Sequence, residues 1–176
     1  MEFRAPTVTV VLMGVSGSGK STVMAHLRDR FDWRSAEADE FHPAANIAKM
    51  SSGQPLNDDD RWPWLRALAA WIGAREAAGE NGLVTCSALK RSYRDLLRDG
   101  HPSVRFVQLS ASIAVLRRRI AQRRGHYMPP SLLASQLETL EPLKPDEPGI
   151  VMSSELLPDQ IVDAIVAWLG LTNRAT

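Results

Sequence analysis

The chain has 176 residues, 44% of them hydrophobic, which is the size and composition of one globular domain. Its 21 Lys and Arg against 20 Asp and Glu give a net charge of +1, which argues against a protein built chiefly to coat nucleic acid. A single cysteine, Cys86, excludes a disulfide-stapled secreted fold. No run approaches the roughly 18 apolar residues of a membrane helix. We therefore expect a cytoplasmic protein that does not enter a membrane.

Short apolar runs alternate with helical patterns along the chain. Residues 7–13 are continuously apolar and β-branched, as in a parallel strand buried on both faces, and are too short for a signal peptide. Further strands are predicted at 35–38, 83–86, 104–109 and 150–152, and helices at 19–30, 64–78, 89–98, 113–124, 131–140 and 159–169. This alternation predicts an α/β fold of three layers, a five-stranded parallel sheet flanked by helices.

Two segments do not fit this pattern. Residues 42–64 are polar, hold three prolines and carry three consecutive aspartates at 58–60. Residues 117–130 hold five arginines, followed by Gly125, His126 and two prolines. Long loops inside a compact domain are often lids or binding elements. We expect both segments to lie over the carboxyl edge of the sheet, after the second and fourth strands.

A phosphate-binding loop follows the first predicted strand. The run Gly14-Val-Ser-Gly-Ser-Gly-Lys20-Ser21 matches G-x-x-x-x-G-K-[ST] and stands between a buried strand and a helix. Its glycines let backbone N–H groups surround phosphate oxygens, Lys20 charges the β- and γ-phosphate site, and Ser21 offers a hydroxyl to Mg²⁺. ATP and Mg²⁺ are thus the predicted cofactors, with the nucleotide held by Gly14, Val15, Ser16, Gly17, Ser18, Gly19, Lys20, Ser21 and Thr22.

The remaining motifs favour a small-molecule kinase among the phosphate-loop proteins. No guanine-reading N-K-x-D is present, which argues against a signalling GTPase. The run at 83–85 ends in Cys86 and Ser87, where many ATPases carry an acid that organises Mg²⁺. Asp39, after the weak second strand, is the best-placed substitute for that acid.

Three further segments resemble the gluconokinase family. One is similar to its acceptor-binding segment: Asp39-x-x-His42-Pro43-x-x-Asn46-x-x-Lys49-Met50-x-x-Gly53-x-Pro55-Leu56-x-Asp58-x-Asp60-Arg61-x-Pro63-Trp64-Leu65. Another matches its second motif: Cys86-Ser-Ala-Leu-Lys90-x-x-Tyr93-Arg94-Asp95-x-Leu97-Arg98. The third resembles its lid: Arg119-x-x-x-Arg123-x-Gly125-His126. The resemblance runs in register from about residue 8 to 168. It implies a P-loop kinase fold related to shikimate and nucleoside-monophosphate kinases, transfer of the ATP γ-phosphoryl group to the 6-hydroxyl of D-gluconate, and a homodimer.

Asp39 suits the chemistry of that transfer. A carboxylate there can orient the attacking hydroxyl and take its proton, or it can hold Mg²⁺ together with Ser21. A purely structural role, as a helix cap ahead of Glu40, is the alternative. Lys20, Asp39 and Arg123 are the predicted catalytic residues.

Gluconate is a carboxylate with a row of hydroxyls, so its site should offer cations and several donors. An arginine fork suits a carboxylate best, and Arg61 stands in the acceptor segment, with Lys90 after the third strand. The alternative for Arg61 is a salt bridge to Asp58 or Asp60. His42 either bonds a sugar hydroxyl or stabilises a turn. The predicted substrate-binding residues are Asp39, His42, Lys49, Arg61, Lys90 and His126.

The arginine run divides by helical spacing. Arg119 and Arg123 are four residues apart on one face, whereas Arg117 and Arg118 lie elsewhere. An arginine pair closing over polyphosphate would neutralise charge developing on the γ-phosphate. The others form a solvated face. The adenine ring is expected between the base of this lid and residues 153–156.

Two other residue types have plain structural alternatives. Cys86 is either a core residue at a strand end or part of the site. Trp64 and Trp71 fall on one helical stripe with Leu68 and Ile72, which favours a core role over base stacking.

We therefore expect residues 1–176 to form a single P-loop kinase domain, with an acceptor-binding segment at about 40–64 and a lid at about 117–136. The predicted partner is the small-molecule substrate, with no nucleic acid and no membrane. Two alternatives remain: a related kinase acting on another small hydroxy acid such as shikimate, and a non-catalytic ATP- or RNA-binding module.

Overall fold

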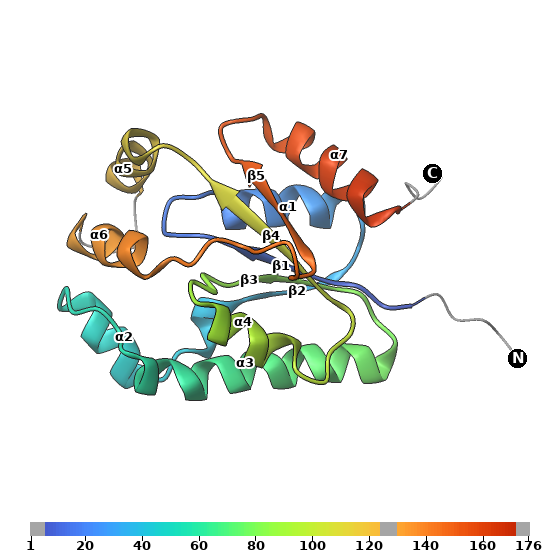
Figure 1. Cartoon of the computed structure of the whole chain (residues 1–176), viewed down its shortest axis with the longest axis horizontal. Helices are drawn as coiled ribbons and strands as arrows, with labels where there is room; N and C mark the ends of the chain where they lie inside the picture. The colour runs from blue at the N-terminus through green and yellow to red at the C-terminus, as the bar shows by residue number, and fades with distance from the viewer. Residues whose placement is uncertain (1–5, 124–129, 172–176) are drawn as a thin grey trace, which may run out of the picture.

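The computed structural model describes residues 6–123 and 130–171. Its strands are β1 (Thr9–Met13), β2 (Arg34–Glu37), β3 (Gly82–Thr85), β4 (Val104–Ser110) and β5 (Gly149–Ser153). In the described chain these five strands form one parallel sheet in the order β2-β3-β1-β4-β5 (Figure 1). The predicted α/β architecture is confirmed, including the strand at 35–38, which lies one residue earlier than expected.

Helices cover both faces of the sheet. They are α1 (Lys20–Arg30), α2 (Ala44–Ser51), α3 (Asp58–Ala78), α4 (Arg91–Arg98), α5 (Ile113–Gln122), α6 (Pro130–Thr139) and α7 (Pro158–Leu169), with a 3₁₀ turn η1 at Ala38–Phe41. In Figure 1, α1 and α7 lie above the sheet and α3 and α4 below it. None of the described helices combines the length and apolarity that a membrane crossing requires.

The central strand β1 explains why the fold has three layers. All of its residues are buried, and alternate side chains enter opposite cores because the side-chain period of a strand is two. Val10 and Leu12 pack with residues of α1 and α7, whereas Val11 and Met13 pack with residues of α3 and α4. A strand covered on both sides must be apolar throughout.

The acceptor-binding segment differs from its prediction as a polar loop. It contains η1, the helix α2, and about the first two turns of α3, which begins six residues earlier than expected. A reciprocal capping box starts α3: the Asn57 side chain accepts from the Asp60 N–H, and the Asp60 carboxylate accepts from the Asn57 N–H. Pro63 lies inside this helix, where it removes one hydrogen bond without ending it, because buried Trp64 and Leu65 hold the helix on the core.

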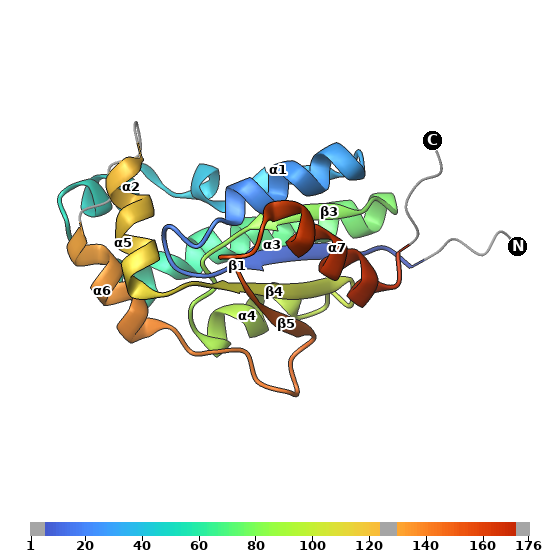
Figure 2. The ribbon, with the colours of Figure 1, turned by 90° about the horizontal axis from the view of Figure 1, so that it is seen from above.

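The connections that follow the strands gather at one edge of the sheet. Figures 1 and 2 place α2, α5 and α6 together at one end of the molecule, with the chain termini at the other. The described parts of both unusual segments, 42–64 and 117–123, are therefore at the carboxyl edge, as expected. The helix predicted at 113–124 ends at Gln122, and Arg123 leaves helical geometry with ψ 126°. Functional side chains thus converge on one edge from distant parts of the sequence.

Candidate active site

The loop between β1 and α1 adopts a conformation that only glycine permits. Gly14 has φ 142°, and a Cβ there would lie 2.7 Å from both the Leu109 carbonyl oxygen and Ser18 Oγ. Gly17 has φ 80°, and a Cβ would lie 3.2 Å from the Leu116 carbonyl oxygen. The loop is therefore curled tightly against α5 and leads into the N-terminus of α1, an arrangement that presents backbone N–H groups to an anion.

Lys20 is the first residue of α1, and its ammonium group is held by the loop itself. Nζ donates to the carbonyl oxygens of Gly14 at 3.0 Å and Val15 at 3.1 Å. Loss of solvent lowers the pKa of Lys20 to about 8, against the opposing influence of the Asp39 carboxylate. The lysine is thus positioned for phosphate before any ligand arrives.

Glu37 is a site residue that the sequence reading missed. Its carboxylate accepts one hydrogen bond from the Ser21 hydroxyl at 3.2 Å and another from the Thr85 hydroxyl. These contacts exist because β2 and β3 pair with Glu37 opposite Thr85, at the strand ends nearest the phosphate loop. The only signal in the sequence was an acid at the end of a weakly predicted strand.

The pair Ser21 and Glu37 has the oxygen chemistry that Mg²⁺ prefers. Among residues 6–123 and 130–171, no three His, Cys, Asp or Glu side chains form a metal cage. Mg²⁺ in kinases needs no such cage, because phosphate oxygens and water complete its coordination. One hydroxyl beside one carboxylate therefore fits this ion.

Asp39 lies in η1, which follows β2 directly. Its side chain is exposed, and it contributes electrostatically at both Lys20 and His42. The alternative of a helix cap is wrong: the N-cap position of η1 is Glu37, and the turn has no side-chain cap. Within the described chain, no hydrogen bond engages the Asp39 carboxylate, so an incoming hydroxyl can reach it.

His42 is held in one orientation and one tautomer. Its ring stacks on buried Trp64 with centroids 4.2 Å apart, and Nδ1 lies 3.3 Å from Asn46 Nδ2. That Asn46 amide nitrogen also donates to the Asp60 carbonyl at 2.8 Å, which identifies it as the NH₂ group. Nδ1 of His42 must then accept, and the proton is on Nε2. Burial lowers the pKa of His42, against the pull of Asp39, so the neutral ring presents one N–H donor.

The cations of the acceptor segment have different partners from those expected. Arg61 donates to the Tyr93 hydroxyl oxygen at 3.0 Å rather than to Asp58 or Asp60, so the salt-bridge alternative is wrong. Asp58 instead accepts from Lys90 Nζ at 3.0 Å and from the Tyr93 hydroxyl, and these hydrogen bonds lower its pKa.

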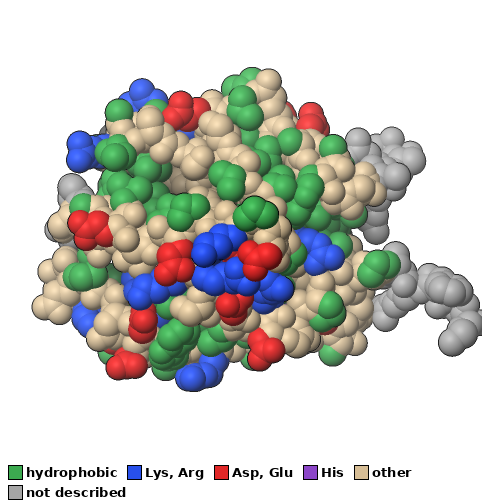
Figure 3. All heavy atoms as spheres, viewed as in Figure 1, with side chains coloured by type: hydrophobic (Ala, Val, Ile, Leu, Met, Phe, Trp, Pro, Cys, Tyr) green, Lys and Arg blue, Asp and Glu red, His purple; other side chains and the backbone are tan. Residues whose placement is uncertain are grey.

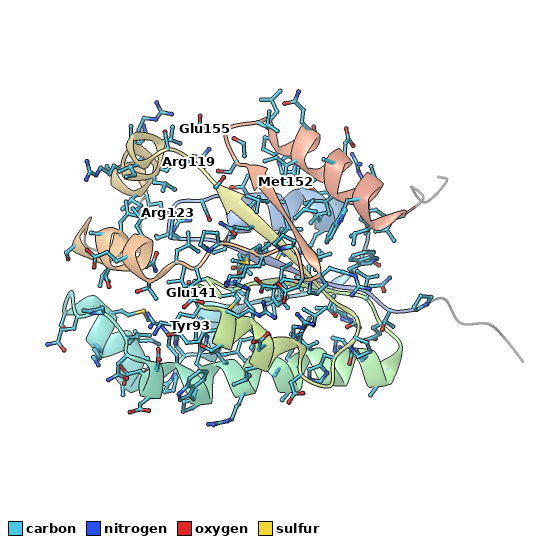
Figure 4. All side chains as sticks on the ribbon, in the orientation of Figure 1. Tyr93, Arg119, Arg123, Glu141, Met152 and Glu155 are labelled. Carbon is cyan, nitrogen blue, oxygen red and sulfur yellow. The ribbon has the colours of Figure 1, made fainter. Side chains whose placement is uncertain are left out.

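Lys49, the remaining cation predicted for this segment, pairs with Asp60 at 2.6 Å. Tyr93 was not among the predicted site residues, although its spacing from Lys90 places both in one helical turn. It joins the two candidate carboxylate-binding cations in one network, and Figure 4 shows it on α4 facing the acceptor segment.

The predicted arginine pair lies beside the phosphate loop. Arg119 donates to the Gly17 carbonyl at 3.2 Å, to Ser154 Oγ at 2.9 Å and to the Ser154 carbonyl at 2.7 Å. It therefore ties α5 both to the phosphate loop and to the segment after β5. Arg117 and Arg118 are exposed, as expected from the helical spacing.

A cavity of about 320 Å³ lies under these arginines. Its lining is Gly17, Gly19, Thr22, Val23, Arg119, Arg123, Ser154, Leu156, Pro158 and Ile161. Arg123 lines the cavity although α5 ends one residue earlier, and Figure 4 shows Arg119 and Arg123 at the end of the molecule where α5 lies. The cavity is at the predicted place for adenine. His126 lies outside the described residues.

Cys86 belongs to the core. It is 1% exposed and packs with buried residues of α3 and α4. Burial raises the pKa of its thiol to about 12. A neutral, inaccessible thiol has no role in group transfer. Trp64 is likewise a core residue, so the base-stacking alternative is wrong for it.

Three features together are typical of a P-loop phosphotransferase. A glycine-rich loop stands between a buried strand and a helix, a hydroxyl lies beside a carboxylate, and a neighbouring cavity is lined by two arginines. Comparison with known proteins narrows the class. A family model described as an AAA domain matches residues 10–143. A gluconokinase of Gluconobacter oxydans is 47% identical over 89% of this chain and 88% of its own length, and the thermoresistant gluconokinase of Escherichia coli is 42% identical over the same shares. The chain belongs to the gluconokinase family.

Solved structures agree with this assignment. An unliganded sugar kinase from Janibacter sp. is 52% identical, with a TM-score of 0.90 over 95% of this chain and 96% of its own. A gluconokinase from Sinorhizobium meliloti is 46% identical, with a TM-score of 0.81 over 95% and 94%. An APS kinase of Mycobacterium tuberculosis, at 19% identity and a TM-score of 0.69, shares the fold.

Proposed function

We propose that this protein transfers the γ-phosphoryl group of ATP to the 6-hydroxyl of D-gluconate, giving 6-phospho-D-gluconate and ADP. The observation that carries the proposal is the meeting, at one sheet edge, of the phosphate loop with a cluster of carboxylate, imidazole and cationic groups from the acceptor segment. Family membership supports the same acceptor.

The phosphate loop and its neighbours bind and orient the nucleotide. Backbone N–H groups of residues 14–22 surround the phosphates, and Lys20 exchanges its carbonyl partners for phosphate oxygens. The cavity beside Leu156 and Pro158 accepts the adenine ring. Arg119 and Arg123 face the polyphosphate and offset negative charge as the terminal group leaves.

The acceptor segment positions the attacking hydroxyl. Asp39 accepts its hydrogen bond and takes its proton, while the Nε2–H of His42 donates to a sugar hydroxyl and keeps the substrate chain in line. His126 is proposed for the same acceptor site on the family resemblance alone.

The cations around Tyr93, Arg61 and Lys90, bind the carboxylate of gluconate in this proposal. Arg61 donates to a neutral phenol, and its positive charge has no direct ion pair within residues 6–123 and 130–171. Lys90 is shared with Asp58, and Lys49 with Asp60. A carboxylate entering this network could accept hydrogen bonds from Arg61, and Lys90 lies in the same cluster.

We propose that Mg²⁺ is held by the Ser21 hydroxyl and, through Glu37, at the end of β2. An ion held there would offset negative charge on the phosphate groups during transfer. Asp39 was the acid first predicted for this role, and Glu37 has the direct contact with Ser21. In this proposal Glu37 serves the Mg²⁺ site and Asp39 serves the acceptor hydroxyl.

We propose that residues 1–176 act as one kinase domain located in the cytoplasm. A homodimer is inferred from the family resemblance, and sedimentation velocity tests it. Binding of nucleic acid is not part of the proposal, since Arg119 is committed to the phosphate loop and to Ser154.

A coupled ADP-release assay across a panel of small acids tests the function. Gluconate should be turned over fastest, and mass spectrometry should identify a phosphorylated aldonate as the product. Faster turnover with shikimate would replace the substrate assignment, and nucleotide binding without any phosphorylated product would contradict the enzymatic proposal.

A further inference from the structure

Gln136 of α6 forms a hydrogen bond to the phosphate loop from a distant part of the sequence. Its side-chain oxygen Oε1 accepts from the backbone N–H of Ser16 at 2.7 Å, across 120 residues. None of the motifs used to recognise the site includes Gln136. The donor is a backbone N–H, so the atom facing it must be the amide oxygen, which fixes the orientation of this side chain.

The peptide group that donates this hydrogen bond also holds the ammonium group of Lys20. The Val15 carbonyl belongs to the same peptide unit as the Ser16 N–H, and it accepts from Lys20 Nζ at 3.1 Å and from the Ser18 N–H at 3.2 Å. A trans peptide is planar, so its C=O and N–H point in opposite directions. Gln136 therefore fixes the N–H of the planar Val15–Ser16 peptide, and the C=O of the same peptide positions Lys20.

The helix that carries Gln136 is firmly placed. Leu132 and Leu133 are 5% and 3% exposed, and Leu133 packs in the cluster that contains Met13 and Val15. Gln136 follows them by one helical turn and so lies on the same side. Figures 1 and 2 place α6 at the end of the molecule that holds the phosphate loop.

Water would replace this acceptor poorly. Ser16 is 7% exposed, so its N–H would lose a partner in a largely enclosed position if the Gln136 oxygen were removed. A buried unpaired N–H carries a desolvation penalty, which the loop can relieve by turning the Val15–Ser16 peptide. That rotation would move the Val15 carbonyl away from Lys20.

We propose that Gln136 is a positioning residue for phosphoryl transfer: it fixes the Val15–Ser16 peptide and through that peptide sets the place of the Lys20 ammonium. The inference rests on the proposed kinase function. Gln136 acts on the nucleotide side, so it should influence ATP binding and turnover but not the affinity for gluconate.

A double-mutant cycle measures this connection. Gln136→Met keeps the length and helix propensity of the side chain but removes the accepting oxygen. Binding of a non-hydrolysable ATP analogue is titrated for wild type, Gln136→Met, Lys20→Met and the double variant, with Mg²⁺ held constant. Glu138→Met, an exposed change on the same helix, is the matched control.

Gln136→Met should weaken analogue binding by about five- to tenfold, the effect of one lost hydrogen bond. It should also lower kcat while the KM for gluconate stays within about twofold. In the Lys20→Met background, the same change should have little further effect, because the lysine it positions is gone. Glu138→Met should match wild type.

An equal loss of analogue affinity in both backgrounds would show that Gln136 does not act through Lys20, and wild-type affinity in Gln136→Met would overturn the proposal outright. Amide exchange of Ser16 in the unaltered protein gives a check that needs no variant: rapid exchange would contradict the hydrogen bond. If the wild type binds the analogue but phosphorylates no gluconate, the proposed function fails, whereas the affinity cycle still decides the role of Gln136.

Discussion

At the scale of single residues, the phosphate loop carries a conflict between folding and function. An ammonium group prefers water, yet Lys20 is drawn from solvent and held by two carbonyl oxygens. Burial disfavours the charged form of Lys20, and this lowers the pKa of its ammonium group. A polyphosphate supplies the missing counter-charge, so binding and protonation of Lys20 are linked.

This linkage predicts a pH dependence of nucleotide binding. Below about pH 7, Lys20 is protonated in the free protein and the Kd for an ATP analogue should be constant. As the pH rises through the lysine pKa of about 8, the free protein loses its proton and the Kd should increase. Titrations of the Kd from about pH 6.5 to about pH 9.5 measure this dependence. Lys20→Met should remove the dependence, and a wild-type Kd that stays flat to the highest pH would refute the assignment.

The proposed role of Glu37 predicts how the activity depends on Mg²⁺ concentration. Glu37→Gln keeps an oxygen near Ser21 and Thr85 but removes the charge, so the Mg²⁺ concentration for half-maximal activity should rise about tenfold or more. Glu40→Gln, an exposed neighbouring change, is the control. Activity is followed against Mg²⁺ at saturating ATP and gluconate. An unchanged Mg²⁺ requirement would leave Glu37 only a structural role between β2 and β3.

At the scale of elements, a buried ion pair joins α4 to the segment before β5. Arg94 and Glu147 have fully buried side chains and form two hydrogen bonds, at 2.6 and 3.0 Å. Arg94 also donates to the carbonyls of Ala88 and Glu141 at 3.0 Å, which places the connection that carries Lys90. Burial would raise the pKa of Glu147, but hydrogen bonds from Arg94 and the Lys144 N–H outweigh it and keep the pKa low.

Breaking this pair should be costly. Arg94→Met leaves the buried carboxylate of Glu147 without its close cation, so the free energy of unfolding should fall by about 3–5 kcal/mol. Arg91→Met is the matched control on the same helix. Its shorter ion pairs, with Asp95 and Asp146, lie at the surface, and Figure 3 shows acidic and basic side chains interleaved over α4 and the connection to β5. Its contact with Glu147 is 3.9 Å long, against 2.6 Å for Arg94, so its loss should change stability much less. Urea denaturation compares the two, and equal effects would contradict the distinction.

At the scale of the whole molecule, Arg119 joins three parts that are separate in sequence. It comes from α5 and binds both the phosphate loop and Ser154 after β5, so the nucleotide site is closed on two sides by one guanidinium. The acceptor segment approaches the same edge from the other side of the sheet. The proposed nucleotide and acceptor sites are therefore held by different layers, so we expect that their residues can be altered independently.

Arg119→Lys tests this division of the site. Lysine cannot reproduce the forked contacts to Gly17 and Ser154, so the KM for ATP should rise about tenfold, with the KM for gluconate nearly unchanged. Arg118→Lys, at an exposed position one residue away, should behave as wild type. Steady-state kinetics with each substrate varied in turn gives both constants. A larger effect on gluconate than on ATP would place Arg119 on the acceptor side.

The sequence by itself determined the features that depend on neighbours along the chain. The phosphate loop, its buried strand and the amphipathic helices were predicted because composition, spacing and glycine content are local signals. The start of α3 was predicted six residues too late, because Pro63 and the polar residues before it indicated a loop. The capping box of Asn57 and Asp60 instead starts the helix at Asp58. Only the tertiary structure brought Glu37 to Ser21, Tyr93 to Arg61 and Gln136 to Ser16. Those contacts depend on strand order and helix packing, which arise from burial of the whole core and leave no short-range mark in the chain.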